Sequence, residues 1–222
     1  MHSYIIGITD IFKQHANAER AVGAKAYMLN QFEFYGLVTA NRRKLAKEYM
    51  KANTLTSQKE LEIIVQACFN LPQREYQYFA VELLSFHKKI WQPSIIKTIE
   101  YCLVHRSWWD SVDHIALECF TFYFQTFPQQ IIPITSKWNA SNNIWLQRSS
   151  IMFQKAFKQK TDTELLGKYI VNCAGSKEFF VQKAIGWALR EYGKSNPKWV
   201  KQFVAQQTLP ALSKREALRR II

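Results

Sequence analysis

A repeat of about 35 residues most constrains the fold of this chain of 222 residues. Gln147 and Gln182 occupy matching places in two similar segments, and each is followed by a cation, Arg148 or Lys183. Counting back from Arg148 in steps of 35 leads to Asp113, Tyr78 and Arg43. Units of this length with two helices each are typical of α-solenoids. Because no useful segment alternates with period two, we predict an all-α solenoid of about six HEAT-like helix pairs, forming a single domain over residues 1–222.

Local signals place the starts of several of these helices. Three capping boxes, in which a Ser or Thr precedes a Glu by three residues, predict helix starts at Ser57, Thr161 and Ser213. Asn143 and Pro197 are typical of the first residues of two further helices. Hydrophobic residues make up 48% of the chain, which is enough to form a core along the whole array.

Equivalent positions in successive solenoid repeats line up along one surface. We therefore expect one concave, basic groove to carry the charged positions of the 35-residue series, Arg43, Asp113, Arg148 and Lys183. Trp109 and Trp187 each lie one helical turn from a member of this series, and Arg190 follows Trp187 by three residues. Cations and aromatic rings together are suited to a phosphate backbone with its sugars and bases. The alternative is that the charges are simply the solvated side of each repeat.

The charge of the chain predicts an anionic partner. Its net charge is +13 at pH 7, which favours nucleic acid, a membrane surface or an acidic protein. The last 47 residues contain ten Lys or Arg and three acidic residues. No apolar run reaches the roughly 18 residues of a membrane span, and no signal-peptide pattern is present. We therefore expect a cytoplasmic protein without membrane contact, associated with the nucleoid through DNA, and monomeric.

The thiols and imidazoles offer no metal or cofactor site. The four cysteines lack C-x-x-C spacing and sit in apolar surroundings, so we expect buried free thiols in a reducing compartment: Cys68, Cys102, Cys119 and Cys173. His87, His105 and His114 lack metal-ligand spacing, and we expect them on the surface or in the groove. No phosphate-binding Gly-rich loop is present. The sequence therefore predicts no metal and no small-molecule cofactor.

The segment Ser107–Asp113 (SWWDSVD) puts two indoles and two carboxylates within seven residues. Ser107 is a predicted helix N-cap, and Asp110 favours the first helical turn. Trp109 and Asp113 are four residues apart and so share one helix face. An aromatic plane beside an anion suits a substrate that is flat or becomes positively charged. The alternative is a buried Trp with solvated acids near it.

Three motifs, together with a fourth near the end, resemble the AlkD-type DNA alkylation repair proteins, which are bacterial HEAT-like-repeat DNA glycosylases. They span 107–113 (SWWDSVD), 142–148 (NNIWLQR), 176–192 (SKEFFVQKAIGWALREY) and 212–217 (LSKREA). The resemblance implies hydrolysis of the N-glycosidic bond of purines alkylated at N3 or N7, such as 3-methyladenine and 7-methylguanine. The family's catalytic carboxylate falls on Asp113 and its aromatic walls fall on Trp109 and Trp187. DNA-backbone contacts are expected from Arg148, Arg43, Arg190, Lys183 and Tyr27.

The charge of such a substrate explains why one carboxylate is enough. An N3- or N7-alkylated purine is already cationic and leaves without protonation, so the paired carboxylates of ordinary glycosidases are not needed. Asp113 then stabilises the oxocarbenium-like sugar and positions or deprotonates the attacking water. We also expect catalysis without flipping of the base into a deep pocket, in contrast to most glycosylases.

Two other functions share parts of this pattern. A non-catalytic module that recognises damaged or branched DNA needs the basic groove but not Asp113. A HEAT scaffold for an acidic protein needs neither strong salt-dependent DNA affinity nor the carboxylate. Release of an alkylated base from duplex DNA separates these alternatives from a glycosylase.

Overall fold

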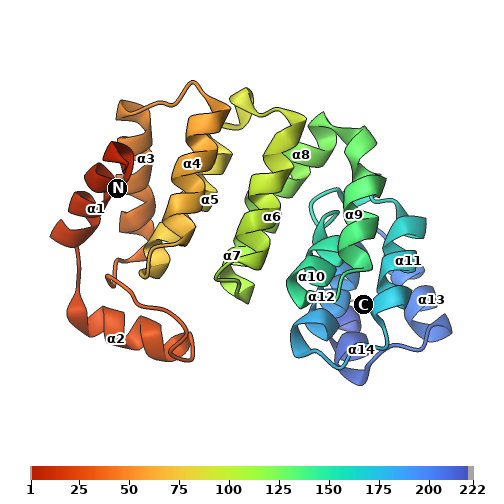
Figure 1. Cartoon of the computed structure of the whole chain (residues 1–222). Helices are drawn as coiled ribbons and strands as arrows, with labels where there is room; N and C mark the ends of the chain where they lie inside the picture. Colours follow the sequence, from red (N-terminus) through yellow and green to blue (C-terminus); the bar gives the residue numbers. More distant parts are fainter. Residues whose placement is uncertain (1, 220–222) are drawn as a thin grey trace. The chain divides into compact units, whose positions relative to one another are not determined.

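The computed structural model describes residues 2–219, and Figure 1 shows that they form helices joined by short turns. No strand occurs among these residues; an isolated bridge pairs Glu33 with Gln73. The all-α prediction is therefore confirmed. The chain divides into two compact units, residues 1–106 and 107–222.

The first unit consists of α-helices linked in places by short 3-10 turns. Its α-helices are α1 (Ser3–Gln14), α2 (Ala18–Tyr27), α3 (Thr39–Ala52), α4 (Gln58–Phe69), α5 (Arg74–Phe86) and α6 (Ile96–Val104). Two 3-10 turns, η1 (Lys88–Ile90) and η2 (Pro93–Ile95), join α5 to α6. Helix α5 packs against α3 and α4, and α4 packs against α6. Helix α2 has no buried residue, so it contributes nothing to this core.

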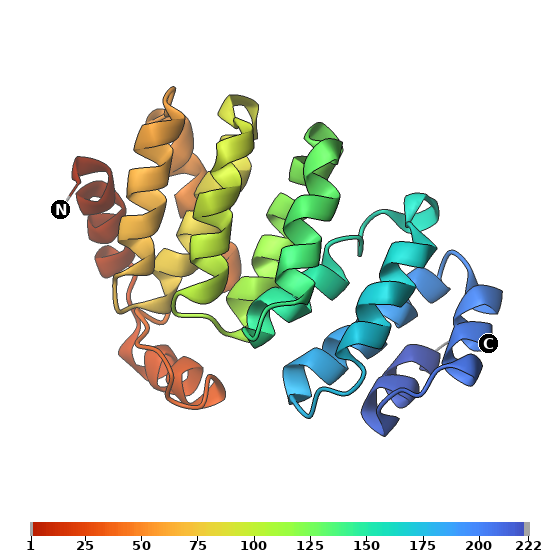
Figure 2. The ribbon, with the colours of Figure 1, turned by 45° about the vertical axis from the view of Figure 1, so that its right-hand side comes forward.

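The second unit holds the shorter helices that carry the indole and carboxylate motif. Its α-helices are α7 (Trp109–Ile115), α8 (Thr121–Thr126), α9 (Ile131–Asn139), α10 (Ile144–Met152), α11 (Thr163–Cys173), α12 (Phe179–Gly193), α13 (Pro197–Gln206) and α14 (Ala211–Leu218). A π-helical turn, η3 (Ala116–Phe120), joins α7 to α8, and η4 (Pro128–Gln130) and η5 (Lys158–Lys160) are 3-10 turns. Helix α10 packs against α9 and α12, and α12 packs against α13 and α14. Helices α3 to α6 of the first unit run side by side in both views, and α2 lies at an angle to them (Figures 1 and 2).

A recurring hydrogen bond marks the repeat in the structure. The side-chain amide nitrogens of Gln147 and Gln182 donate to the carbonyl oxygens of Ser141 and Ser176, six residues earlier, at 2.8 and 3.0 Å. Gln77, at the matching place in the first unit, donates in the same way to the carbonyl of Leu71 at 3.0 Å. We call this contact the glutamine brace. It ties the start of each second helix to the preceding turn, so the helix pair is a repeated structural unit.

The helix starts agree with the sequence signals in some places and differ in others. Ser57 and Asn143 are N-caps, and Pro197 is the first residue of α13. The box at Thr161 is shifted by one residue, because Asp162 is the N-cap and accepts from the backbone N–H of Leu165 at 2.9 Å. The box at Ser213 is wrong, since α14 begins two residues earlier, after Pro210. The Ser213 hydroxyl instead donates to the carbonyl of Gln182 at 2.8 Å.

The predicted environments of the thiols are confirmed and that of one imidazole is wrong. All four cysteines are buried free thiols. His87, expected at the surface or in the groove, is 4% exposed. Its Nε2 accepts from the backbone N–H of Leu55 at 2.9 Å, and its Nδ1 lies 3.0 Å from the carbonyl of Leu83. Two backbone contacts satisfy the ring, so His87 is a structural residue of the first unit.

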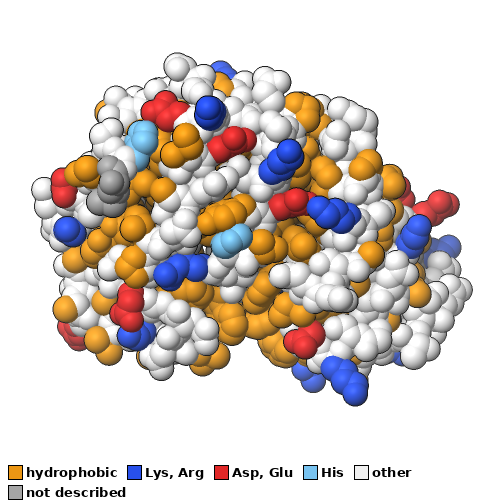
Figure 3. Space-filling view, viewed as in Figure 1, with side chains coloured by type: hydrophobic (Ala, Val, Ile, Leu, Met, Phe, Trp, Pro, Cys, Tyr) orange, Lys and Arg blue, Asp and Glu red, His pale blue; other side chains and the backbone are white. Residues whose placement is uncertain are grey.

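The cations are dispersed on the face shown in Figure 3. Lys and Arg side chains stand there among apolar and acidic ones and do not gather into one patch. The predicted concave basic groove would run over both units, and it stays a prediction, as does their union in one domain. Across residues 2–219, no helix is long and apolar enough to cross a membrane.

Candidate active site

Helix α7 positions the first two residues of the site. It begins at Trp109, and its N-cap is Trp108 with extended backbone angles (φ −152°, ψ 163°), so the prediction of Ser107 as N-cap is off by one residue. The carbonyl of Trp108 accepts from the backbone N–H of Val112 at 3.1 Å and from the hydroxyl of Ser111 at 3.2 Å. With the helix start held in this way, Trp109 and Asp113 line the same pocket.

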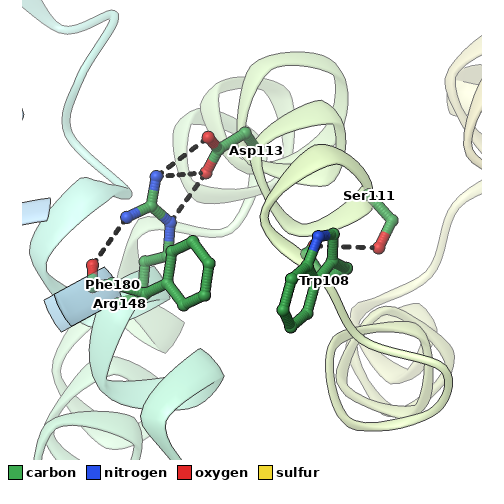
Figure 4. A network of polar contacts seen from close by, with 5 residues as sticks. All are labelled: Trp108, Ser111, Asp113, Arg148 and Phe180. Atoms are coloured by element: carbon green, nitrogen blue, oxygen red, sulfur yellow. Dashed lines mark hydrogen bonds and ion pairs between the residues drawn. The ribbon is translucent and has the colours of Figure 1, made fainter. Parts of the chain in front are cut away.

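The carboxylate of Asp113 forms a bidentate ion pair with Arg148 (Figure 4). The Nε and Nη2 atoms of Arg148 each donate to one carboxylate oxygen of Asp113 at 2.8 Å, and Nη1 donates to the carbonyl of Phe180 at 2.7 Å. Asp113 is 9% exposed and Arg148 is 3% exposed. Helices α7, α10 and α12 therefore meet at this guanidinium, which orients the carboxylate with little rotational freedom.

The environment of Asp113 sets its protonation. Burial raises the pKa of the Asp113 carboxyl, because the charged form loses water. The charge and hydrogen bonds of Arg148 act in the opposite direction, and the more distant charge of Lys155 adds to them. The side chain is thus a desolvated carboxylate whose ionisation depends on its cationic neighbours.

A pocket of about 290 Å³ brings most of the sequence-predicted residues together. Its lining consists of Trp109, Asp113, Arg148, Phe180, Lys183, Trp187, Arg190 and Glu216. Lys183 Nζ lies 3.0 Å from one carboxylate oxygen of Glu216, and Arg190 Nη1 lies 2.7 Å from the other. The hydrogen bond from Lys183, reinforced by Arg190, lowers the pKa of Glu216. Glu216 therefore holds two cations at the edge of the pocket.

The two indoles of the site have different surroundings from their neighbour Trp108. Trp187 has the guanidinium carbon of Arg148 5.8 Å from its ring centroid and Lys155 Nζ at 3.4 Å. Trp108 packs away from this contact, edge-on against Phe180 with ring centroids 5.2 Å apart. Trp145 joins that cluster at 6.0 Å from Trp108. Trp108 is thus a packing residue, and Trp109 and Trp187 are the indoles of the pocket.

Two predicted residues belong to the first unit. Tyr27, at the end of α2, is 70% exposed and lines a cavity of about 230 Å³ together with Arg42 and Tyr78. Arg43 Nε lies 3.3 Å from a carboxylate oxygen of Glu82. Arg42 makes the stronger pair with Glu82, through both Nη atoms at 2.8 and 2.9 Å. Of these two neighbouring arginines Arg42 is therefore the buried one, and Arg43 is exposed.

Comparison with known proteins identifies the family of the chain. A sequence model described as "DNA alkylation repair enzyme" matches residues 8–221. The chain belongs to this family. A solved structure, "Predicted DNA alkylation repair enzyme from Enterococcus faecalis", is 31% identical with a TM-score of 0.87, covering 93% of this chain and 97% of that one. A protein described as smu.31 from Streptococcus mutans UA159 has a TM-score of 0.62 at 15% identity, covering 82% of this chain and 98% of that one, and shows the fold alone. No curated protein matches.

Membership of the DNA alkylation repair enzyme family supports a role in DNA repair. It agrees with the resemblance drawn from the tryptophan motifs.

Three residues at or beside the site were missed in the sequence. Glu216 was assigned to a capping box, and nothing in its spacing links it to Lys183. Phe180 contributes a backbone carbonyl, which any residue would supply. Lys155 had a signal, because it lies 35 residues before Arg190 and so occupies the equivalent place in the preceding repeat.

Close packing of α12 on α14 predicts a strong effect of substituting Gly186. A Cβ atom there would lie 2.5 Å from Glu216 Cβ and 2.9 Å from the carbonyl oxygen of Ser213. We expect Gly186→Ala to lower the free energy of unfolding by about 1–3 kcal/mol, because the α14 backbone must shift. Urea unfolding measures this. Gly175→Ala is the matched control, since a Cβ at Gly175 meets nothing within 4 Å; equal stability of the two variants would contradict the packing argument.

Proposed function

We propose that this chain is a DNA glycosylase that hydrolyses the N-glycosidic bond of cationic N3- or N7-alkylated purines in duplex DNA. The observation that carries the proposal is a desolvated carboxylate, Asp113, oriented by Arg148 in a pocket that Trp109 and Trp187 also line. Family membership supports DNA as the substrate.

The proposed reaction uses Asp113 as its one carboxylate. The bond between C1′ and the purine nitrogen breaks, and its electron pair neutralises the cationic base, so no proton donor is required. Positive charge develops on the sugar, and the carboxylate of Asp113 stabilises it. Water adds to C1′ and loses a proton to Asp113 or to solvent. An uncharged base would have to leave as an anion or be protonated as it leaves. Asp113 is needed in its ionised form and cannot donate that proton, so lesion charge determines the substrate.

The indoles and the remaining cations have distinct roles in this proposal. The π faces of Trp109 and Trp187 stabilise the cationic sugar and base by roughly 1–2 kcal/mol each where water is excluded. Lys183 and Arg190, held by Glu216, bind phosphate beside the lesion. Arg148 acts chiefly on Asp113, because its Nε, Nη1 and Nη2 atoms all donate within the protein. Further phosphate contacts are assigned to Tyr27 and Arg43 of the first unit.

The residues that line the pocket favour catalysis without hydrogen bonds to the edge of the base. A flipped base is recognised through hydrogen bonds to its edge. Among the lining residues there is no amide or hydroxyl side chain, and Asp113 and Arg148 are paired with each other. We therefore propose that the enzyme approaches the deoxyribose and leaves the base outside. A complex in which the protein encloses the lesion base would overturn this part.

Release of the base tests the proposal directly. We expect single-turnover release of 7-methylguanine from a duplex with one lesion, and much slower release of neutral hypoxanthine from a matched duplex, measured by chromatography of the free base. DNA affinity should fall with salt, with a log–log slope of about −0.9 for each phosphate contact. Binding without release would indicate a non-catalytic DNA-recognition module. Absence of salt-dependent DNA binding would indicate a scaffold for an acidic protein.

A further inference from the structure

Lys155 lies in the turn that follows α10, next to Trp187 of the site. Its backbone N–H donates to the carbonyl of Met152 at 2.9 Å, which fixes the point from which the side chain starts. Its Nζ atom reaches the ring of Trp187 on α12, 3.4 Å from the centroid. This is a closer cation–ring contact than that of Arg148 with the same indole, at 5.8 Å.

The ammonium of Lys155 makes this contact in place of a carboxylate partner. In the described part of the chain, no carboxylate oxygen lies within 4.0 Å of it, whereas Lys183 and Lys194 each pair with a Glu. Lys155 also lines a cavity of about 240 Å³ with Lys158, Lys194 and Glu191. The cation–π attraction between an ammonium and an aromatic ring is stronger in a partly desolvated place than at an exposed one.

The charge of Lys155 affects the pKa of Asp113. Burial lowers the pKa of Lys155, while attraction to Asp113 and Glu191 raises it and repulsion from Arg148 and Lys194 lowers it. The reciprocal attraction lowers the pKa of Asp113, in the same direction as Arg148 and against burial and the neighbouring Asp110. Lys155 thus contacts one proposed catalytic residue and interacts electrostatically with another.

We propose that Lys155 is a positioning residue: its ammonium, 3.4 Å from the ring centroid of Trp187, fixes the plane of that indole in the pocket. The role in the reaction rests on the proposed glycosylase function. A cation centred over one face of the indole resists rotation of the ring, and it occupies that face. Lys155 itself need not touch the substrate.

Substitutions that separate charge from packing test this role. Lys155→Met keeps the length and apolar contact of the side chain and removes the charge, and Lys155→Arg keeps the charge. Lys158→Met is the matched control, because Lys158 lines the same cavity and is exposed. We expect release of 7-methylguanine at neutral pH to fall roughly three- to tenfold in Lys155→Met, and to remain near the wild-type rate in Lys155→Arg and Lys158→Met. The acid limb of the pH–rate profile should move to higher pH in Lys155→Met alone.

A titration of the free protein decides the electrostatic part without DNA. The ¹³C signal of the Asp113 carboxyl should titrate at higher pH in Lys155→Met than in the wild type, and Lys155→Arg should restore the wild-type midpoint. Lys155→Gln carries the same expectation if the methionine variant does not fold. An unchanged Asp113 midpoint in the uncharged variants would refute the electrostatic effect, and release at the wild-type rate in Lys155→Met would overturn the inference. Failure of the wild type to release any base would instead refute the proposed function, while the titration would still report on Lys155.

Discussion

Asp113→Asn is expected to lower release of 7-methylguanine by on the order of a thousandfold or more. The amide has the shape of the carboxylate but no charge, so it neither stabilises the sugar cation nor takes a proton from water. Its oxygen still accepts from Arg148, which keeps the helices in place. DNA affinity should therefore stay within a few-fold of wild type. Single-turnover release and equilibrium binding on the same lesion duplex measure the two properties.

Asp110→Asn is the matched control for this substitution. Asp110 lies in the first turn of the same helix and raises the pKa of Asp113 through charge repulsion. Removing its charge should leave release near the wild-type rate and shift the acid limb of the pH–rate profile slightly to lower pH. Loss of release in both variants to the same extent, or near-normal release in Asp113→Asn, would contradict the assignment of Asp113.

Arg148→Met is expected to be the most destabilising single substitution in the site. It leaves the buried carboxylate of Asp113 without its counterion, and breaking such a buried pair costs about 3–5 kcal/mol. Lys183→Met removes the cation at the equivalent position of the next repeat. Because Lys183 is partly exposed and its partner Glu216 keeps Arg190, that substitution should cost less than about 1 kcal/mol. Denaturant unfolding of the two variants provides the comparison.

The destabilisation in Arg148→Met should depend on pH. Without the guanidinium, the folded-state pKa of Asp113 rises further above its unfolded value, so the folded state binds a proton that the unfolded state has already released. The loss of stability is then largest at neutral pH and shrinks as the pH falls and Asp113 becomes protonated. Adding Asp113→Asn to Arg148→Met should recover part of the lost stability. A pH-independent loss would show that the cost comes from packing alone.

The centre of the site could be predicted from the sequence because it follows the period of the repeat. Asp113, Arg148 and Lys183 stand 35 residues apart, and the structure pairs the first two and puts all three in the lining of one pocket. The i,i+4 spacing likewise put Trp109 beside Asp113. Period and helix geometry determine which positions share a surface, and these are properties that a sequence contains.

Contacts made by tertiary packing could not be predicted in this way. Glu216 reaches Lys183 and Arg190 only because α14 docks on α12 at Gly186. In the same packing the Ser213 hydroxyl donates to the carbonyl of Gln182 on α12 and does not cap α14. The capping-box pattern therefore predicted the wrong helix start. The family resemblance assigned Arg148 to a DNA phosphate, whereas in the structure its Nε, Nη1 and Nη2 atoms donate to Asp113 and to the carbonyl of Phe180.

Lys155 was missed for a different reason. The period does point to it from Arg190, but a period alone does not say where the helix that begins after Asn143 ends. The structure ends α10 at Met152, and a turn carries Lys155 onto the ring of Trp187. Similarly, the π-helical turn after α7 has no signal in composition or capping residues.

The glutamine brace has a consequence for how such arrays diversify. In three repeats the amide fixes the local backbone, and the very next residue is Tyr78, Arg148 or Lys183. The brace itself uses only the glutamine, so it does not depend on the chemistry of the residue that follows, although Arg148 is held by its separate ion pair with Asp113. In the repeat between Gln77 and Gln147 the matching residue is Val112, which cannot form the brace. Asp113 follows it, so the proposed catalytic carboxylate lies in the repeat of this series that lacks the brace. The residue after the brace can therefore differ in chemistry from one repeat to the next, as Tyr78, Arg148 and Lys183 do, while the brace stays the same.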